Sequence, residues 1–254
     1  MSALALRFRS TGRWYYCSTI VRRRFYDRST DVLRTVKRLV IAIDGPSGAG
    51  KGTLARTVAA RLGYEHVDTG AMYRAVAWRA ANEGVPLDDD DRVAAVARRA
   101  VYQQVGGLIT IDGHDVTRAI RTPEIDKAAA SVARLAQVRE VLVGQQRAMG
   151  AAGGVVMEGR DIGTVVFPQA DLKIYIDASA EERARRRAAD PAHTGSQSNI
   201  ANVQSEMAAR DKSDSTRAIA PLSMATDAVL IDTTTMPIDA VVNRVMLLVM
   251  EKLE

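Results

Sequence analysis

The sequence predicts an α/β protein built on a doubly wound, five-stranded parallel sheet. Five short apolar segments have the length and composition of strands that are covered on both faces. Segments with helical patterns separate most of them, and strands that alternate with helices form parallel sheets. A glycine-rich turn joins the first apolar segment to the first helix. The expected strands are residues 39–44, 64–67, 154–158, 171–177 and 228–232.

Local signals mark the ends of the expected helices. Gly63 follows the first helix, and glycine commonly ends a helix because it adopts a left-handed conformation at little cost. A second helix is expected over about 71–82. Ser179 and Glu182 have the spacing of a capping box and open an Arg-rich helix. Pro237 suits the first turn of the last helix.

Residues from about 88 to 150 break this alternation and predict an insertion in one connection of the sheet. Residues 108–111, followed by Asp112-Gly113, have the pattern of a β-hairpin. Thr122 and Pro123 then begin a segment expected to form one long, Ala-rich helix. Residues 190–200 are polar and turn-rich, which indicates a mobile flap.

The charge of the chain is concentrated in its first 37 residues. They contain nine Lys or Arg and two acidic residues, a formal charge of +7 against +5 for the 254 residues together. The remainder, residues 38–254, therefore carries −2, which argues against a nucleic-acid-binding surface there. We expect a basic extension over 1–37, with no regular structure, and one folded domain over 38–254.

The extension leaves three interpretations open. An Arg-rich, acid-poor start with Ser and Thr is typical of an organelle transit peptide. A basic tail that contacts membranes or nucleic acid would have the same composition. The third interpretation is an upstream stretch with no selected structure, which a misplaced start would produce. Cys17 lies there, so the body has no thiolate metal site; the three histidines, far apart in sequence, are expected to be structural or exposed.

A phosphate-binding loop follows the first strand directly. Its glycines let backbone N–H groups converge on phosphate oxygens, the helix N-terminus favours negative charge, and a lysine adds a positive charge. Gly52 stands where the common pattern has Ser or Thr, so Mg²⁺ is expected to be held mostly by phosphates and water. The expected ATP-binding residues are Gly45, Pro46, Ser47, Gly48, Ala49, Gly50, Lys51, Gly52 and Thr53.

Beyond this loop the chain resembles the bacterial cytidylate kinases, from about Leu39 to its C-terminus. The Gly-Lys-Gly-Thr ending of the loop is itself typical of P-loop nucleoside monophosphate kinases. Six further segments in the same order carry the resemblance; they are residues 68–74, 120–122, 137–140, 158–168, 209–211 and 217–222. The resemblance implies a monophosphate-binding subdomain over about 68–150 and a lid over about 184–212.

The family likeness also implies roles for individual residues. Arg74 would grip the monophosphate beside Thr69 and Tyr73, and Arg160 would meet phosphate; Asp161 beside it reads the base or forms a plain ion pair with it. Ser131 and Arg139 match positions that contact cytosine, and their eight-residue spacing places them on one face of the expected long helix. Arg210 and Asp214 would reach the sugar and Arg217 the phosphates. The implied catalytic residues are Lys51, Arg160, Arg210 and Arg217; which of Arg183, Arg185, Arg186 and Arg187 contact phosphate stays open.

The implied activity is ATP-dependent phosphorylation of CMP and dCMP to CDP and dCDP, with Mg²⁺, in pyrimidine nucleotide metabolism. The expected enzyme is a cytoplasmic monomer whose partners are nucleotides rather than nucleic acid or membrane. The alternatives are a monophosphate kinase with another acceptor such as UMP, a P-loop kinase of a small metabolite, and a P-loop regulatory or nucleic-acid-binding protein.

Overall fold

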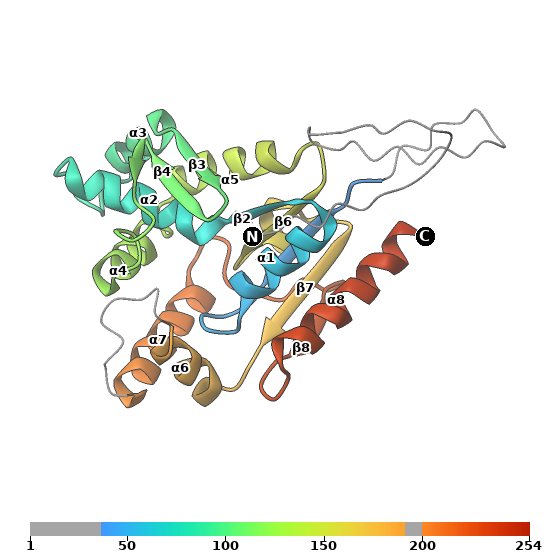
Figure 1. Ribbon diagram of the computed structural model, residues 1–254. Helices are drawn as coiled ribbons and strands as arrows, with labels where there is room; N and C mark the ends of the chain where they lie inside the picture. The colour runs from blue at the N-terminus through green and yellow to red at the C-terminus, as the bar shows by residue number, and fades with distance from the viewer. Residues whose placement is uncertain (1–36, 191–199) are drawn as a thin grey trace, which may run out of the picture. The chain divides into compact units, whose positions relative to one another are not determined.

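The computed structural model describes residues 37–190 and 200–254 (Figure 1). Two units are distinguished, Met1–Lys37 and Arg38–Glu254, and the fold described below is that of the second. The basic extension, apart from Lys37, and the expected flap over 190–200, apart from its two end residues, lie outside the described residues.

A five-stranded parallel sheet forms the centre of this unit, in the order β2-β6-β1-β7-β8. The order places the first strand in the middle, so the chain winds outward in both directions from β1. The register pairs Val40 with Val155 and Ile41 with Leu172. The five strands confirm the sequence prediction; they are β1 (Val40–Asp44), β2 (Glu65–Asp68), β6 (Val155–Gly159), β7 (Leu172–Asp177) and β8 (Val229–Asp232).

Helices cover both faces of the sheet, which explains why its strands are apolar throughout. Ile41 and Ile43 of β1 belong to a buried cluster with α1 (Lys51–Leu62) and α8 (Ile238–Leu253). Ala42, which points to the other face, belongs to a second cluster with α2 (Thr69–Asn82) and α5 (Ala136–Gly150). The sheet therefore separates two hydrophobic cores.

The helix ends follow the local signals in the sequence. Gly63 ends α1 in the left-handed conformation, with φ of 65°. Ser179 caps α6 (Ala180–Ala188) by accepting from the backbone N–H of Glu182 at 3.2 Å. Thr122 caps α4 (Pro123–Val132) in the same way. These contacts are local along the chain, and for that reason they are readable from the sequence.

The insertion packs onto α2 through a small antiparallel sheet. The sheet contains β3 (Tyr102–Val105), β4 (Leu108–Ile111) and β5 (His114–Asp115) and follows α3 (Asp90–Arg99). The Asp112-Gly113 turn has positive φ at both residues, as the hairpin prediction requires. Ile109 and Ile111 are buried with Ala71 and Ala75 of α2. Neither α3 nor β3 was identified in the sequence.

The single long helix expected after Thr122 is wrong, because the chain forms α4 and α5 with a turn between them. Leu135 has an extended conformation and precedes the first turn of α5. The carboxylate of Asp90, which belongs to α3, accepts from the backbone N–H of Gln137 at 3.1 and 3.2 Å and of Val138 at 3.3 Å. A residue 47 positions away thus caps α5, and helix propensity carries no trace of such a cap.

Candidate active site

The phosphate loop occupies the turn between β1 and α1. Gly45 has φ of 150°, and a Cβ built on it would lie 2.0 Å from the carbonyl oxygen of Ile176 in the neighbouring strand β7. The loop therefore passes too close to the sheet for any side chain at this position. Gly50 adopts a left-handed conformation and directs the chain into α1. Both glycines are thus required by geometry, as the sequence pattern indicated.

Lys51 extends from the first turn of α1 back over this loop. Its Nζ donates to the carbonyl oxygen of Pro46 at 2.6 Å, and the residue is buried. Burial and the nearby positive charge of Arg160 lower its pKa well below the usual value, and Glu158 only partly opposes this. An anion that binds next to such a buried cation stabilises its charged form. The loop is therefore prepared for phosphate.

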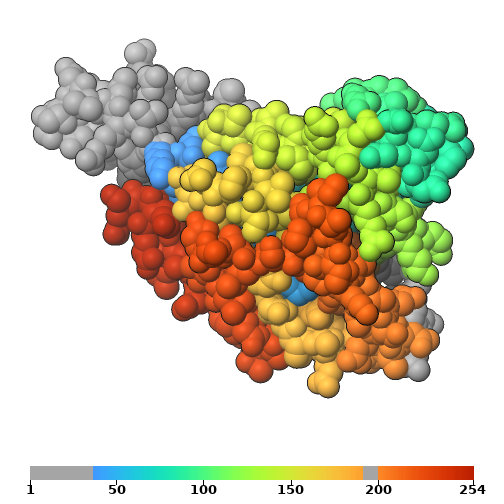
Figure 2. Space-filling view, turned by 180° about the vertical axis from the view of Figure 1, so that it is seen from behind, coloured from blue at the N-terminus to red at the C-terminus, as the bar shows by residue number. Residues whose placement is uncertain are grey.

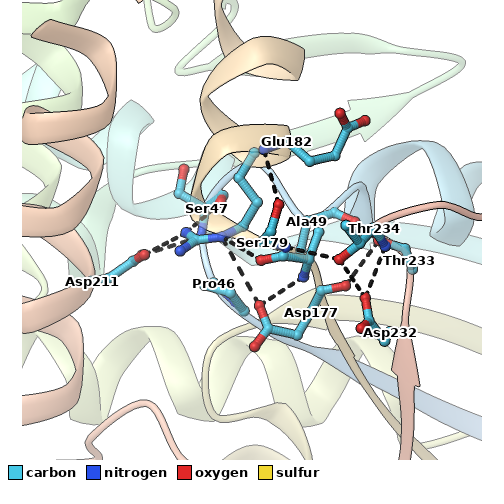
Figure 3. A network of polar contacts seen from close by, with 12 residues as sticks. Pro46, Ser47, Ala49, Asp177, Ser179, Glu182, Asp211, Asp232, Thr233 and Thr234 are labelled. Atoms are coloured by element: carbon cyan, nitrogen blue, oxygen red, sulfur yellow. Dashed lines mark hydrogen bonds and ion pairs between the residues drawn. The ribbon is translucent and has the colours of Figure 1, made fainter. Parts of the chain in front are cut away.

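Helix α6 is fastened to the loop by polar contacts (Figure 3). Arg183 donates to the carbonyl oxygens of Ser47 at 3.1 Å and Ala178 at 3.0 Å, and it pairs with Asp211 of α7 (Ile200–Thr216). The Thr233 hydroxyl donates to the carbonyl oxygen of Ala49 at 3.2 Å. The space-filling view shows α6 in gold against α7 in orange (Figure 2), and the two helices pack together. The loop and the two helices of the expected lid thus form one connected group.

A cavity of about 960 Å³ opens beside the loop, at the carboxyl ends of β2 and β6. Ligands bind at this edge in open parallel α/β sheets. Eleven basic and five acidic side chains line the cavity, an excess that suits two polyanionic ligands. The basic residues are Lys51, Arg56, Arg74, Arg118, Arg121, Arg139, Arg160, Arg186, Arg187, Arg210 and Arg217; the acidic ones are Asp68, Glu158, Asp161, Asp190 and Asp214.

Arg74 is held at the cavity wall by the residue that begins its own helix. The Asp68 carboxylate accepts from the backbone N–H of Ala71 at 2.9 Å, capping α2, and pairs with Arg74 at 3.0 Å. Burial raises the pKa of Asp68, but Arg74 and this backbone hydrogen bond outweigh it, so the pKa is lowered. The Thr69 hydroxyl donates to the carbonyl oxygen of Glu158 at 2.7 Å. One turn therefore aims a guanidinium into the cavity and ties α2 to β6.

Asp161, another residue of the cavity wall, lies between two arginines. It forms a buried ion pair with Arg139 of α5, and Arg217 approaches its other oxygen at 3.6 Å. The Arg139 guanidinium lies 5.8 Å from the centre of the Tyr73 ring. Burial raises the pKa of Tyr73 to about 12, so its hydroxyl stays protonated. The Asp161 carboxylate, the Arg139 guanidinium and the Tyr73 ring thus meet in one place. The two charged groups provide hydrogen-bonding edges and the ring provides a flat face, which are the features that recognition of a nucleobase requires.

Arg160 pairs with the residue expected at the sugar and not with its sequence neighbour. Its Nε donates to Asp214 of α7 at 3.0 Å. In place of an ion pair between Arg160 and Asp161, the structure has two separate pairs, Arg160–Asp214 and Arg139–Asp161. The structure brings most of the expected residues together in one cavity wall. They are Lys51, Thr69, Tyr73, Arg74, Arg139, Arg160, Asp161, Arg210, Asp214 and Arg217.

Ser131 does not belong to that wall. It is exposed near the end of α4, and its hydroxyl donates to the carbonyl oxygen of Lys127 at 3.4 Å. Because α4 and α5 are separate helices, Ser131 and Arg139 do not share one helix face. The cavity residues on α4 and just after it are Ala129, Ala130 and Ala133. The only support for a contact between Ser131 and the nucleobase is therefore the family resemblance.

The four arginines of α6 have different surroundings. Arg186 and Arg187 line the cavity. Arg183 instead anchors the phosphate loop, and Arg185 is exposed and pairs with Glu182 at 2.7 Å. Arg187, together with Arg210 of α7 at 3.4 Å, contacts Asp126 of α4. Helices α6 and α7 are thus both connected to the insertion by carboxylate–guanidinium contacts.

Sequence reasoning missed several acidic residues that organise the site. Asp44, the last residue of β1, accepts from the backbone N–H of Ile162 at 2.9 Å and Gly163 at 2.7 Å and so shapes the π-helical turn η1 (Ile162–Val166). Burial raises its pKa to about 6. Glu158, the last residue but one of β6, lines the cavity, and Asp126 contacts Arg187 and Arg210. For Asp44 and Glu158 a signal was present, because both are charged residues at the carboxyl end of an apolar strand.

A glycine-rich loop that leads into a cation-lined cavity, at the carboxyl edge of a parallel sheet, is typical of P-loop nucleotide-binding proteins. A family model described as "Cytidylate kinase" matches residues 41–251. The chain is 47% identical over 221 residues to a cytidylate kinase of Desulfitobacterium hafniense, covering 86% of this chain and 95% of the relative. It is 50% identical over 208 residues to one of Desulforamulus reducens, covering 81% and 94%. This chain belongs to the cytidylate kinase family.

Among solved structures, a shikimate kinase from Acinetobacter baumannii in complex with shikimate matches at 15% identity, with a TM-score of 0.46 and coverage of 85% and 95%. In the part of the chain that the structure describes, no helix is both long and apolar enough to cross a membrane.

Proposed function

We propose that this chain transfers the γ-phosphoryl group of ATP to CMP and dCMP, forming ADP and CDP or dCDP. The observation that carries the proposal is the single cavity whose wall contains both the phosphate loop and the Arg74 and Asp161 groups. Two nucleotides bound at these places face each other across Lys51 and Arg160. The resemblance to cytidylate kinases selects the acceptor.

The reaction needs no protein nucleophile. A phosphate oxygen of CMP attacks the γ-phosphorus, the bond from that phosphorus to the β,γ-bridging oxygen breaks, and ADP leaves with the electron pair. Lys51, Arg160, Arg210 and Arg217 neutralise charge on the transferring group, and Arg74 fixes the acceptor phosphate bidentately. Positioning two polyanions that repel each other accounts for the excess of arginines.

Mg²⁺ fits the loop, although no group of three or more His, Cys, Asp or Glu among the described residues is placed to hold a metal ion by itself. Mg²⁺ prefers oxygen ligands and typically uses one or two carboxylates together with substrate phosphates and water. Glu158 supplies a carboxylate next to Gly52, where a Cβ would lie 3.2 Å from its Oε1. Glu158 and the ATP phosphates would hold the ion, which neutralises phosphate charge.

Asp161 and Arg139 are proposed to distinguish cytosine from uracil. Cytosine has an amino donor where uracil has a carbonyl, and an N3 acceptor where uracil carries N–H. A carboxylate accepts from the amino group, and a guanidinium donates to the acceptor side of the ring. Uracil would leave buried polar groups unpaired, at a cost of about 1–3 kcal/mol for each.

The remaining proposals concern partners and location. We propose that the enzyme acts as a monomer in the cytoplasm, with nucleotides as partners and without binding nucleic acid. The formal charge of −2 over residues 38–254 supports the last point.

A coupled assay of ADP formation with CMP, dCMP, UMP and AMP tests the function. We expect turnover with CMP and dCMP that far exceeds turnover with the other two. A preference for UMP would replace the acceptor and keep the enzyme class. ATP hydrolysis that no monophosphate stimulates would overturn the kinase proposal.

A further inference from the structure

A partly buried polar chain connects the phosphate loop with the inserted hairpin, and its central member is His66 of β2. The His66 Nε2 lies 2.9 Å from Oε1 of Glu158, and its Nδ1 lies 3.3 Å from Nε2 of Gln104 on β3. The side chains of His66 and Glu158 are 13% and 9% exposed. None of the reaction steps described above uses this histidine.

The hydrogen bonds around Gln104 decide where the proton of His66 lies. Gln104 Oε1 accepts from the backbone N–H of Asp68 at 3.1 Å and from the Tyr102 hydroxyl at 3.0 Å. The amide oxygen is therefore the atom turned away from His66, and the amide nitrogen donates to Nδ1. Since a neutral imidazole has one donor and one acceptor, its proton is on Nε2, which donates to Glu158.

Glu158 is held in place by this donated hydrogen bond. Its carboxylate faces Gly52, where a Cβ would lie 3.2 Å from Oε1 and 3.6 Å from Oε2. A serine or threonine at 52, as in the common phosphate-loop pattern, would require the carboxylate to move by a few tenths of an ångström. Burial lowers the pKa of Lys51, and the same carboxylate partly opposes this shift. A displaced carboxylate would thus change the charge around the loop.

We propose that His66 is a positioning residue for phosphoryl transfer, because its Nε2–H fixes the Glu158 carboxylate beside Gly52 and Lys51. Gln104 sets the tautomer that makes this possible, and through Asp68 the same residue is joined to the turn that holds Arg74. The donor loop and the acceptor arginine are thus fastened to one hydrogen-bonded chain. The inference rests on the proposed kinase function.

Two substitutions separate this role from a structural one. The side-chain nitrogen of glutamine lies near the position of Nε2, whereas the amide of asparagine reaches only the position of Nδ1. His66→Gln therefore keeps a donor toward Glu158, and His66→Asn keeps only the contact with Gln104. Hydrogen bonds to charged groups are strong enough that we expect His66→Asn and His66→Ala to lower kcat about tenfold, with His66→Gln within about threefold of the parent.

The measurements are kcat, the two KM values and the melting temperature. A calorimetric titration with ADP and Mg²⁺ follows the donor site without any acceptor. Because Glu158 lies at the donor loop, His66→Asn should weaken ADP binding and leave the KM for CMP within about twofold, since no acceptor contact is lost. Glu158→Gln should make a further His66→Asn change nearly silent. His114→Gln, at the exposed histidine of β5, is the matched control.

Three results would overturn the proposal. His66→Asn that performs better than His66→Gln would show that the contact with Gln104 matters and the donor to Glu158 does not. Equal losses in all three variants would indicate packing alone, and unchanged ADP binding and kcat in all three would show that His66 has no role. Failure of the kinase function itself would appear separately, as a parent protein that binds ADP but does not phosphorylate CMP.

Discussion

The donor and acceptor sides of the cavity are built in opposite ways. The donor side is one continuous stretch, residues 45–53, which presents backbone N–H groups and a single lysine. The acceptor side collects side chains from α2, α5, α7 and the segment after β6, and carboxylates pair with its arginines. The backbone loop needs no rearrangement to present its N–H groups, whereas an arginine that pairs with a carboxylate, such as Arg74 with Asp68, would have to share or release that partner to bind a phosphate. A substitution in the loop should therefore have one large effect on turnover. Substitutions on the acceptor side should have smaller effects that depend on one another.

The largest expected effect is at the donor side. Lys51→Met removes the one side-chain cation of the loop, and we expect kcat to fall by at least about 10²-fold, the usual cost of removing a preorganised charge contact. Lys252→Met, at an exposed position of α8, is the control and should keep full activity. A folded Lys51→Met protein with near-normal turnover would remove the ATP site from this loop.

The next effect concerns base choice on the acceptor side. We expect the parent to favour CMP over UMP by about 10²-fold in kcat/KM, equivalent to about 2.7 kcal/mol. Asp161→Ala should narrow this ratio, because it removes the acceptor for the cytosine amino group. Both ratios come from kcat/KM measured with each substrate.

Asp161→Ala also leaves Arg139 buried without its partner, which costs stability. Asp161→Asn keeps a hydrogen-bond acceptor and provides a second folded variant, and melting temperatures identify the proteins fit for comparison. An unchanged CMP:UMP ratio in both variants would mean that Asp161 does not discriminate between the bases.

A smaller effect is expected at Arg74. Lysine keeps the charge but offers no bidentate geometry, so Arg74→Lys should raise the KM for CMP about tenfold. The KM for ATP should change little, since Arg74 lies on the acceptor side. Arg92→Lys, exposed on α3, is the matched control. Equal changes in both KM values would show that Arg74 affects ATP binding as much as CMP binding, so the donor and acceptor sides would not be independent.

The smallest effect is expected from the basic extension. A protein that begins at Arg38 should keep its melting temperature and its kcat/KM for CMP, because residues 1–37 have no core pattern in the sequence. Loss of activity, or a drop of several degrees in melting temperature, would make the extension part of the working fold.

The parts that the sequence predicted correctly are those fixed by neighbours along the chain. The five strands, the phosphate loop, the Gly63 stop and the Ser179 cap each depend on residues within a few positions. The division between α4 and α5 was not predicted because its cause, Asp90, belongs to another helix. The expectation that Ser131 and Arg139 share one helix face was wrong for the same reason.

The sequence by itself thus determined the fold class and the glycine-rich loop, and it identified side chains that the structure brings together in one cavity. Only the tertiary structure decided which charges meet: Asp161 with Arg139, Arg160 with Asp214, and His66 with Glu158. Backbone conformation and capping act over three or four residues and leave a pattern in the chain. Ion pairs between distant segments depend on how helices and strands pack, and one sequence carries no local record of that packing.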